Sequence, residues 1–135
     1  MATYKRAYGD FGENLACNYL QKNKYKILAR NFSDKMGEID IIAIETKASR
    51  KRSEDYCNMS KIIKNEDVLV FIEVKSRHSN LYGEPFEAVD KEKQRRYYNL
   101  STIFMLKNNL TDFQHRFDII EVLEDSVVHH YKNAF

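Results

Sequence analysis

Residues 68–77 read Val-Leu-Val-Phe-Ile-Glu-Val-Lys-Ser-Arg, and this stretch decides the fold. Its first five residues are apolar and mostly β-branched or aromatic, which is typical of a buried strand. Charged residues then alternate with Val and Ser. Because strand side chains alternate between two faces, Glu73, Lys75 and Arg77 project from the same face. Buried charges need partners, and strand ends often carry the chemistry of α/β proteins, so the sequence predicts a functional site here.

The composition predicts one compact domain. A chain of 135 residues with 43% hydrophobic and 31% charged residues can bury a real core under a charged surface. The net charge of +2 does not by itself indicate a nucleic-acid-binding protein, so that function requires local clustering of Lys and Arg. No apolar run approaches the roughly 18 residues of a membrane span, and the N-terminus lacks the apolar stretch of a signal peptide. We expect residues 1–135 to form a single domain. We also expect the protein to be cytoplasmic, with no membrane association and with both cysteines reduced.

The first predicted helix covers residues 9–25, with Asp10 as its N-cap. Phe11, Leu15 and Tyr19 are four residues apart and define one buried face. Glu13 lies on or beside that face. One interpretation is a boundary residue whose carboxylate reaches water, and the other is a functional carboxylate directed inward.

Two strands are predicted next, over residues 26–32 and 38–44, joined by a polar turn. Asp40 lies between isoleucines on the second strand, where an unpartnered carboxylate is unfavourable. Residues 45–67 carry six Lys and Arg residues and show no periodicity, which indicates a hairpin insertion. This insertion is either a basic flap that contacts phosphates or a solvated loop.

The second predicted helix covers residues 86–106. Lys93 falls on its apolar stripe, so it either extends to the surface or meets a negative group. A terminal hairpin of residues 115–123 and Ser126–Tyr131 follows, in which Arg116 and Asp118 share a face and can pair or extend the polar cluster. The adjacent His129 and His130 point to opposite faces, so they cannot chelate one ion, and we expect them on the surface or in the hairpin.

Two carboxylates at the ends of adjacent strands, Asp40 and Glu73, can converge on one point. Hard oxygen ligands of this kind suit Mg²⁺ or Mn²⁺. Lys75 can then hold a water molecule or a phosphate, and Glu13 can reach the same point from the first helix. This set of residues favours a hydrolytic nuclease site. A structural ion-pair network is the competing interpretation.

The order of the motifs resembles the YraN family of small bacterial proteins, from about residue 8 to the last residue. The motifs are Gly12-Glu13, Arg30-Asn31, Gly37-Glu38-Ile39-Asp40, Phe71 to Arg77, Lys93 to Arg96, Arg116-Phe117-Asp118 and Asn133-Ala134-Phe135. This family is similar to Holliday-junction resolvases and to the PD-(D/E)xK nuclease superfamily. The resemblance implies a restriction-endonuclease-like α/β fold, with a mixed sheet flanked by helices in the order α-β-β-β-α-β-β.

The resemblance also implies roles for individual residues. Asp40, Glu73 and Lys75 fall on the catalytic positions of the superfamily, Glu13 on its accessory helix glutamate, and Lys93 and Gln94 on polar helix positions. The sequence departs from the family pattern in two places. Residues 45–67 are longer than the usual hairpin, and Ile39 replaces the proline of the superfamily name.

Three hypotheses follow. The first is a divalent-metal-dependent endonuclease that acts on DNA, particularly structured or branched DNA in repair or recombination, for which a homodimer would be natural. Asp40 and Glu73 would bind the metal, and the DNA backbone would contact Arg77, Lys93, Gln94, Arg95 and Arg96. The second is a non-catalytic nucleic-acid-binding protein on the same fold. The third is a protein-interaction domain that uses the nine tyrosines of the chain.

Overall fold

The computed structural model describes residues 4–46, 67–77 and 89–135. Within these ranges, two helices and five strands follow one another in the predicted order α-β-β-β-α-β-β. They are α1 (Tyr4–Lys22), β1 (Tyr25–Asp34), β2 (Gly37–Glu45), β3 (Val68–Arg77), α2 (Lys91–Lys107), β4 (Gln114–Leu123) and β5 (Ser126–Tyr131). The interpretation of residues 45–67 as an insertion stays a prediction, since most of that segment lies outside the described residues.

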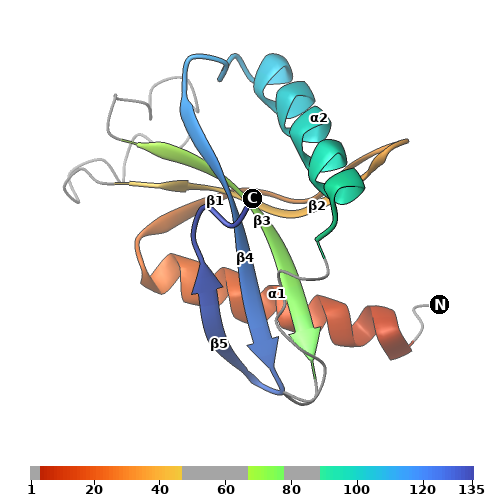
Figure 1. Ribbon diagram of the computed structural model, residues 1–135. Coiled ribbons are helices and arrows are strands. Elements are labelled where there is room, and N and C mark those ends of the chain that lie inside the picture. Colours follow the sequence, from red (N-terminus) through yellow and green to blue (C-terminus); the bar gives the residue numbers. More distant parts are fainter. Residues whose placement is uncertain (1–3, 47–66, 78–88) are drawn as a thin grey trace.

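The strands form a single mixed sheet in the order β1-β2-β3-β4-β5 (Figure 1). Neighbouring strands are antiparallel except for β3 and β4, which are parallel and are connected through α2. A parallel pair needs such a crossover connection, and a helix usually supplies it. The predicted α/β class with a mixed central sheet is confirmed.

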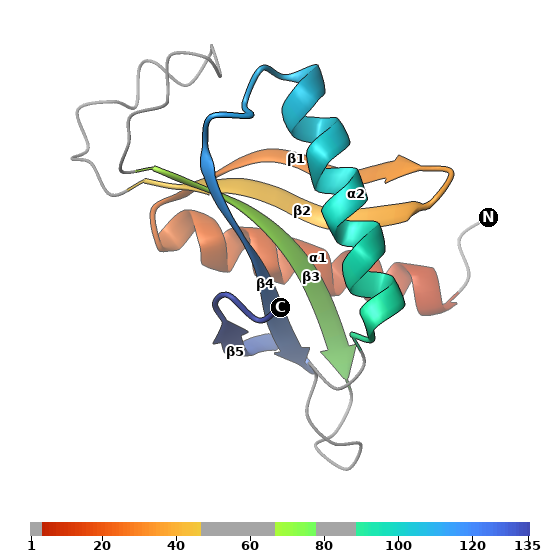
Figure 2. The same cartoon turned by 45° about the horizontal axis from the view of Figure 1, so that its top comes forward.

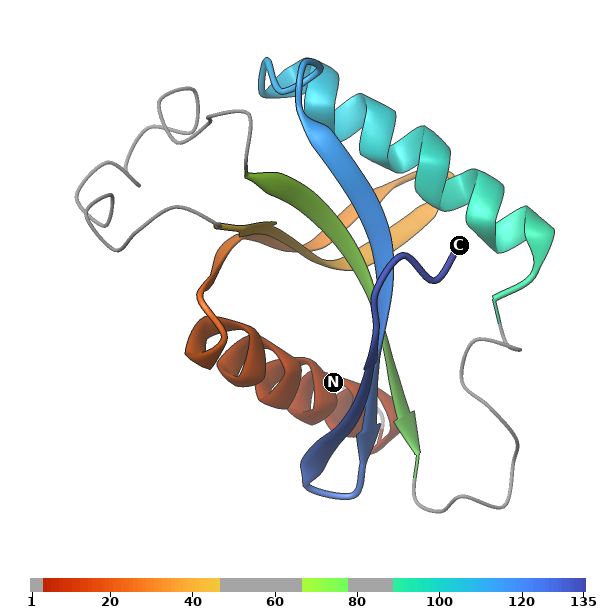
Figure 3. The same cartoon turned by 60° about the vertical axis from the view of Figure 1, so that its left-hand side comes forward.

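The two helices cover opposite faces of the sheet, as Figure 3 shows. Phe71, Tyr97 and Phe104 belong to the core between the sheet and α2. Leu20 and Ile72 belong to the second core, between the sheet and α1. The alternation along β3 therefore turns Phe71 toward α2 and Ile72 toward α1. No helix in the described ranges is long and apolar enough to cross a membrane.

Both predicted helix starts were wrong. Helix α1 begins at Tyr4, so Asp10 lies inside the helix and is not its N-cap. Helix α2 begins at Lys91, and its N-cap is Asp90, whose side chain accepts a hydrogen bond from the N–H of Lys93 at 2.8 Å. The sequence predicted a start at residue 86, but residues 89 and 90 are not helical. A capping side chain outweighed the apolar periodicity here, because it satisfies a backbone donor that the helix leaves free.

Strands β2 and β3 separate before either strand ends. Their pairing joins Ile41–Glu45 of β2 to Val68–Ile72 of β3 and stops there, whereas β2 stays paired with β1 as far as Gly37. The tip of the β1–β2 hairpin therefore turns away from β3 (Figure 2). Asp40 and Glu73 are the first residues beyond the paired segment on the two strands. We call this point of separation the fork.

Candidate active site

Three carboxylates converge on the β2 side of the fork. Glu13 from α1 and Glu38 and Asp40 from β2 each offer an oxygen atom, and these oxygens lie within 4.8 Å of one another. We call these three residues the acidic cluster. With its amide nitrogen facing the cluster, Asn31 donates to Glu38 Oε1 at 2.7 Å and to Glu13 Oε2 at 3.1 Å. Arg30 lies next to the cluster, with its Nη2 atom 3.6 Å from Glu13 Oε2.

A close approach of α1 to β3 places Glu13 at the fork. A Cβ atom added to Gly12 would lie 2.0 Å from Ser76 Oγ and 3.3 Å from Ser76 Cβ. Only a residue without a side chain fits this contact, so Gly12 lets the helix lie directly on the end of β3. The next residue, Glu13, is buried as a result.

Burial and nearby negative charges raise the pKa values of Asp40 and Glu13. Burial first, and the charge of Glu73 second, raise the pKa of Asp40 to about 8. The N–H of Val74 donates to Asp40 Oδ2 at 2.8 Å and offsets part of this rise. Burial also raises the pKa of Glu13. The site therefore favours the neutral, protonated forms of Asp40 and Glu13.

The pKa of Glu73 is shifted in the opposite direction, so that its ionised form is favoured. Burial alone would raise its pKa, but Lys93, Tyr97 and Lys75 outweigh burial and hold the pKa of Glu73 below its ordinary value. Lys93 Nζ and Tyr97 Oη both donate to the Glu73 carboxylate, and Lys75 Nζ lies 3.2 Å from Glu73 Oε1. Lys93 therefore meets a negative group, which confirms one of its two predicted alternatives.

The structure thus divides the predicted catalytic residues between two neighbouring groups. Glu13 and Asp40 belong to the acidic cluster, whereas Glu73 and Lys75 bond to each other on the β3 side of the fork. Among the described residues, Glu38 and not Glu73 completes the set of converging oxygens. Glu73 still acts on Asp40 through its charge. The pairing of Asp40 with Glu73 around a metal ion stays a prediction.

The predicted nucleic-acid-binding residues differ in their accessibility. Arg77 Nη2 bonds to the buried Glu121 of β4. Gln94 donates to a backbone carbonyl just before its own helix at 3.2 Å. Arg95 and Arg96 are exposed on α2, and Arg96 bonds to a glutamate one turn earlier at 2.8 Å. The exposed basic side chains of the predicted set therefore lie on α2.

Three residues of the site were not predicted as functional. Glu38 precedes Asp40 by two positions, so the alternation of the strand already placed it on the same face. Tyr97 follows Lys93 by four positions on α2, which also gives both residues one face. No periodicity in the sequence indicated a functional role for Asn31, which was noted only as part of the Arg30-Asn31 motif. It adopts a φ of 53°, a left-handed backbone conformation that Asn tolerates better than most residues.

A second polar network lies on β4 and is fully partnered. Asp118 is completely buried, and it accepts from Arg116 Nε at 2.9 Å and from the Asn133 N–H at 2.9 Å. His130 Nε2 lies 2.7 Å from the other Asp118 oxygen, and Arg116 also bonds to Glu45 at 3.0 Å. The predicted pairing of Arg116 with Asp118 is confirmed. This network joins β2, β4 and β5 and acts as a structural element.

Comparison with known proteins places the chain in a family. The profile described as "Uncharacterised protein family UPF0102" matches residues 12–122. UPF0102 proteins from Clostridium tetani and Caldanaerobacter subterraneus subsp. tengcongensis are each 39% identical to the chain. The first comparison covers 100% of this chain and 98% of the relative, and the second covers 97% and 96%. The chain belongs to the UPF0102 family, which is the YraN family that its motifs resemble.

Proposed function

We propose that this member of the UPF0102 family is a divalent-metal-dependent endonuclease that acts on DNA, with structured or branched DNA as its substrate. The convergence of Glu13, Glu38 and Asp40 at the fork carries this proposal. The element order and the mixed sheet also agree with the restriction-endonuclease-like fold that the resemblance implies.

The donor set fits Mg²⁺ or Mn²⁺. Carboxylate oxygens are the hard ligands that these ions prefer, and Mg²⁺ commonly uses only one or two carboxylates together with water. Burial and, second, the charge of Glu73 disfavour the ionised form of Asp40, and a bound cation would favour that form instead. Asp40 and Glu13 would hold the ion, with Glu73 on the adjoining strand. A bound ion would supply the positive charge that stabilises the phosphate during hydrolysis.

The basic residues would position the DNA. Lys75 and Lys93 present two ammonium groups at the Glu73 carboxylate, where they can hold a phosphate oxygen or orient a water molecule. Arg95 and Arg96 are exposed on the same helix as Lys93 and can contact the backbone on either side of the site.

A non-catalytic nucleic-acid-binding protein is the second candidate function. The bonds of Glu73 favour it, because Tyr97, Lys93 and Lys75 already satisfy this carboxylate as in a structural ion-pair network. This candidate predicts salt-dependent binding of DNA without metal-dependent cleavage.

A cleavage assay with matched variants distinguishes the two candidates. The substrates are labelled single-stranded, duplex, flap and four-way-junction DNA, each in Mg²⁺, Mn²⁺ or EDTA. Glu73→Gln and Lys75→Ala test the site, while Glu124→Gln and Lys107→Ala change exposed residues of the same types. We expect metal-dependent cleavage that both site variants lose and both control variants keep. Binding without cleavage by the wild type, or cleavage that survives in Glu73→Gln, would overturn the proposal.

A further inference from the structure

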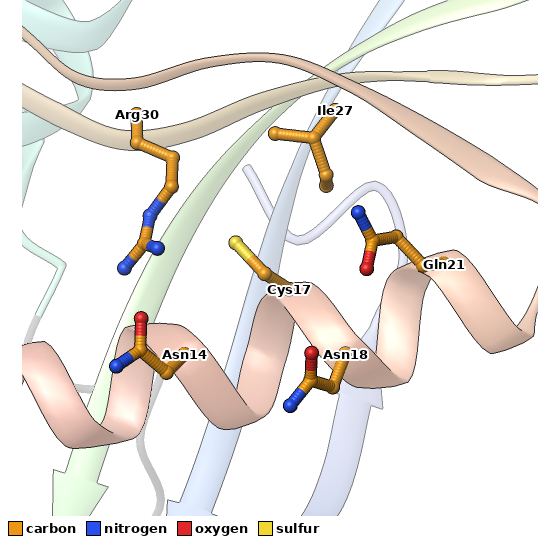
Figure 4. Close-up of a pocket in the computed structure, with 6 residues that line it drawn as sticks. All are labelled: Asn14, Cys17, Asn18, Gln21, Ile27 and Arg30. Atoms are coloured by element: carbon orange, nitrogen blue, oxygen red, sulfur yellow. The ribbon is translucent and has the colours of Figure 1, made fainter.

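An open polar groove lies between α1 and the edge strand β1, as Figure 4 shows. Its volume is about 420 Å³, within the range of ligand-binding sites. Asn14, Asn18 and Gln21 line its α1 wall and are all exposed, so the groove opens to solvent along the helix. The side-chain amides of these three residues form no hydrogen bond with any other residue that the structure describes.

The groove and the acidic cluster share a wall. Arg30 lines the groove from β1, and its guanidinium lies 3.6 Å from Glu13 of the acidic cluster. Asn14 lies beside Arg30 in Figure 4, and in the sequence it directly follows Glu13. A ligand in the groove would therefore have one end next to the acidic cluster.

The chemistry of the groove changes along its length. Arg30 supplies the positive charge at the end near the acidic cluster, where a phosphate would bind. Cys17 from α1 and Ile27 from β1 both point into the space between the two elements and provide a small apolar surface (Figure 4). The three amides each offer a donor and an acceptor, the combination that reads the hydrogen-bonding edge of a nucleobase. An apolar contact beside amide groups, with the Arg30 guanidinium next to them, suits an unstacked base.

We propose that this groove binds an unpaired nucleotide of the DNA substrate, with its phosphate at Arg30 and its base along α1. The inference rests on the proposed function and specifies its substrate as DNA with an unpaired nucleotide beside the cleaved bond. The amides span residues 14–21, about 10 Å of helix. At about 3.4 Å per nucleotide of a DNA strand, this length accommodates at most about three nucleotides. The groove would therefore select a local distortion of the DNA and not a long single strand.

Binding of bulged DNA tests the inference. Fluorescence anisotropy in EDTA compares a duplex, the same duplex with a one-nucleotide bulge, and the same bulge without its base. The variant Asn14→Ala/Asn18→Ala/Gln21→Ala removes the amides, and Asn23→Ala removes an exposed amide outside the groove. We expect wild type and Asn23→Ala to bind the intact bulge about tenfold more tightly than the baseless bulge. The triple variant should bind both bulges equally, with an unchanged melting temperature.

Each other outcome has a distinct meaning. Equal binding of the two bulges by the wild type, or a preference that survives in the triple variant, would overturn the groove as a base-binding site. The proposed function would stand in either case if metal-dependent cleavage persists. A wild type that neither binds nor cleaves DNA would overturn both the proposed function and this inference.

Discussion

Replacing Asp40 by Asn isolates the electrostatic effect of a crowded carboxylate on stability. Burial and the charge of Glu73 raise the pKa of Asp40 from 3.8 to about 8. Between these two values folding takes up a proton. The free energy of unfolding of the wild type therefore falls as the pH rises, by at most about 1.4 kcal/mol per pH unit. Asn has the shape of a protonated Asp and can still accept the Val74 N–H, but it does not titrate.

The stability of Asp40→Asn relative to wild type should therefore grow by about 3 kcal/mol between about pH 6 and about pH 9, and most of that growth should come below about pH 8. Urea unfolding followed by circular dichroism, in EDTA and at several pH values, measures this difference. Asp112→Asn, at an exposed position, is the control and should follow the wild type at every pH. A stability difference that is constant with pH, or that shrinks as the pH rises, would refute the conclusion that its surroundings at the fork keep Asp40 protonated.

Three further predictions test other contacts. Because Asp40 must lose its proton to hold a cation, calorimetry should show Mn²⁺ affinity weakening by up to about tenfold per pH unit below about pH 8; a flat profile would contradict this. Gly12→Ala should lower the free energy of unfolding by about 1 kcal/mol, because a contact with Ser76 that costs about 1–3 kcal/mol outweighs the gain of up to about 1 kcal/mol in helix propensity; a more stable variant in urea unfolding would argue against the close approach. Asp118→Ala should lower the free energy of unfolding by about 3 kcal/mol or more, because Arg116 Nε and the Asn133 N–H would lose their acceptor. A smaller loss in the same assay would indicate a weaker network.

The strands were predictable because their signals are local. Five apolar residues followed by alternating charges identify β3 and assign Glu73 and Lys75 to one face, without knowledge of the partner strands. The helix starts were harder to predict. Gly9 resembles a helix boundary because it disfavours helix, yet α1 continues through it to Tyr4, so the tertiary structure overrides this propensity.

The acidic cluster was only partly predictable. The inward position of Glu13 and the isoleucines around Asp40 both indicated that these carboxylates need partners. The contribution of Glu38 depends on where β2 leaves β3, and that point follows from the pairing of three strands and not from any one segment. The groove depends on how closely α1 approaches β1, which is likewise a property of packing between distant segments.

The two candidate functions assign different roles to the same carboxylate. Glu73 is held ionised by Lys93, Tyr97 and Lys75, whereas Asp40 across the fork is held protonated. An ionised carboxylate can exchange an ammonium partner for a metal ion without first losing a proton, but a protonated one cannot. The ion-pair network and the proposed metal site would therefore be compatible states of one arrangement. In the first, Lys75 and Lys93 neutralise Glu73; in the second, a cation at the fork would release both ammonium groups to a phosphate.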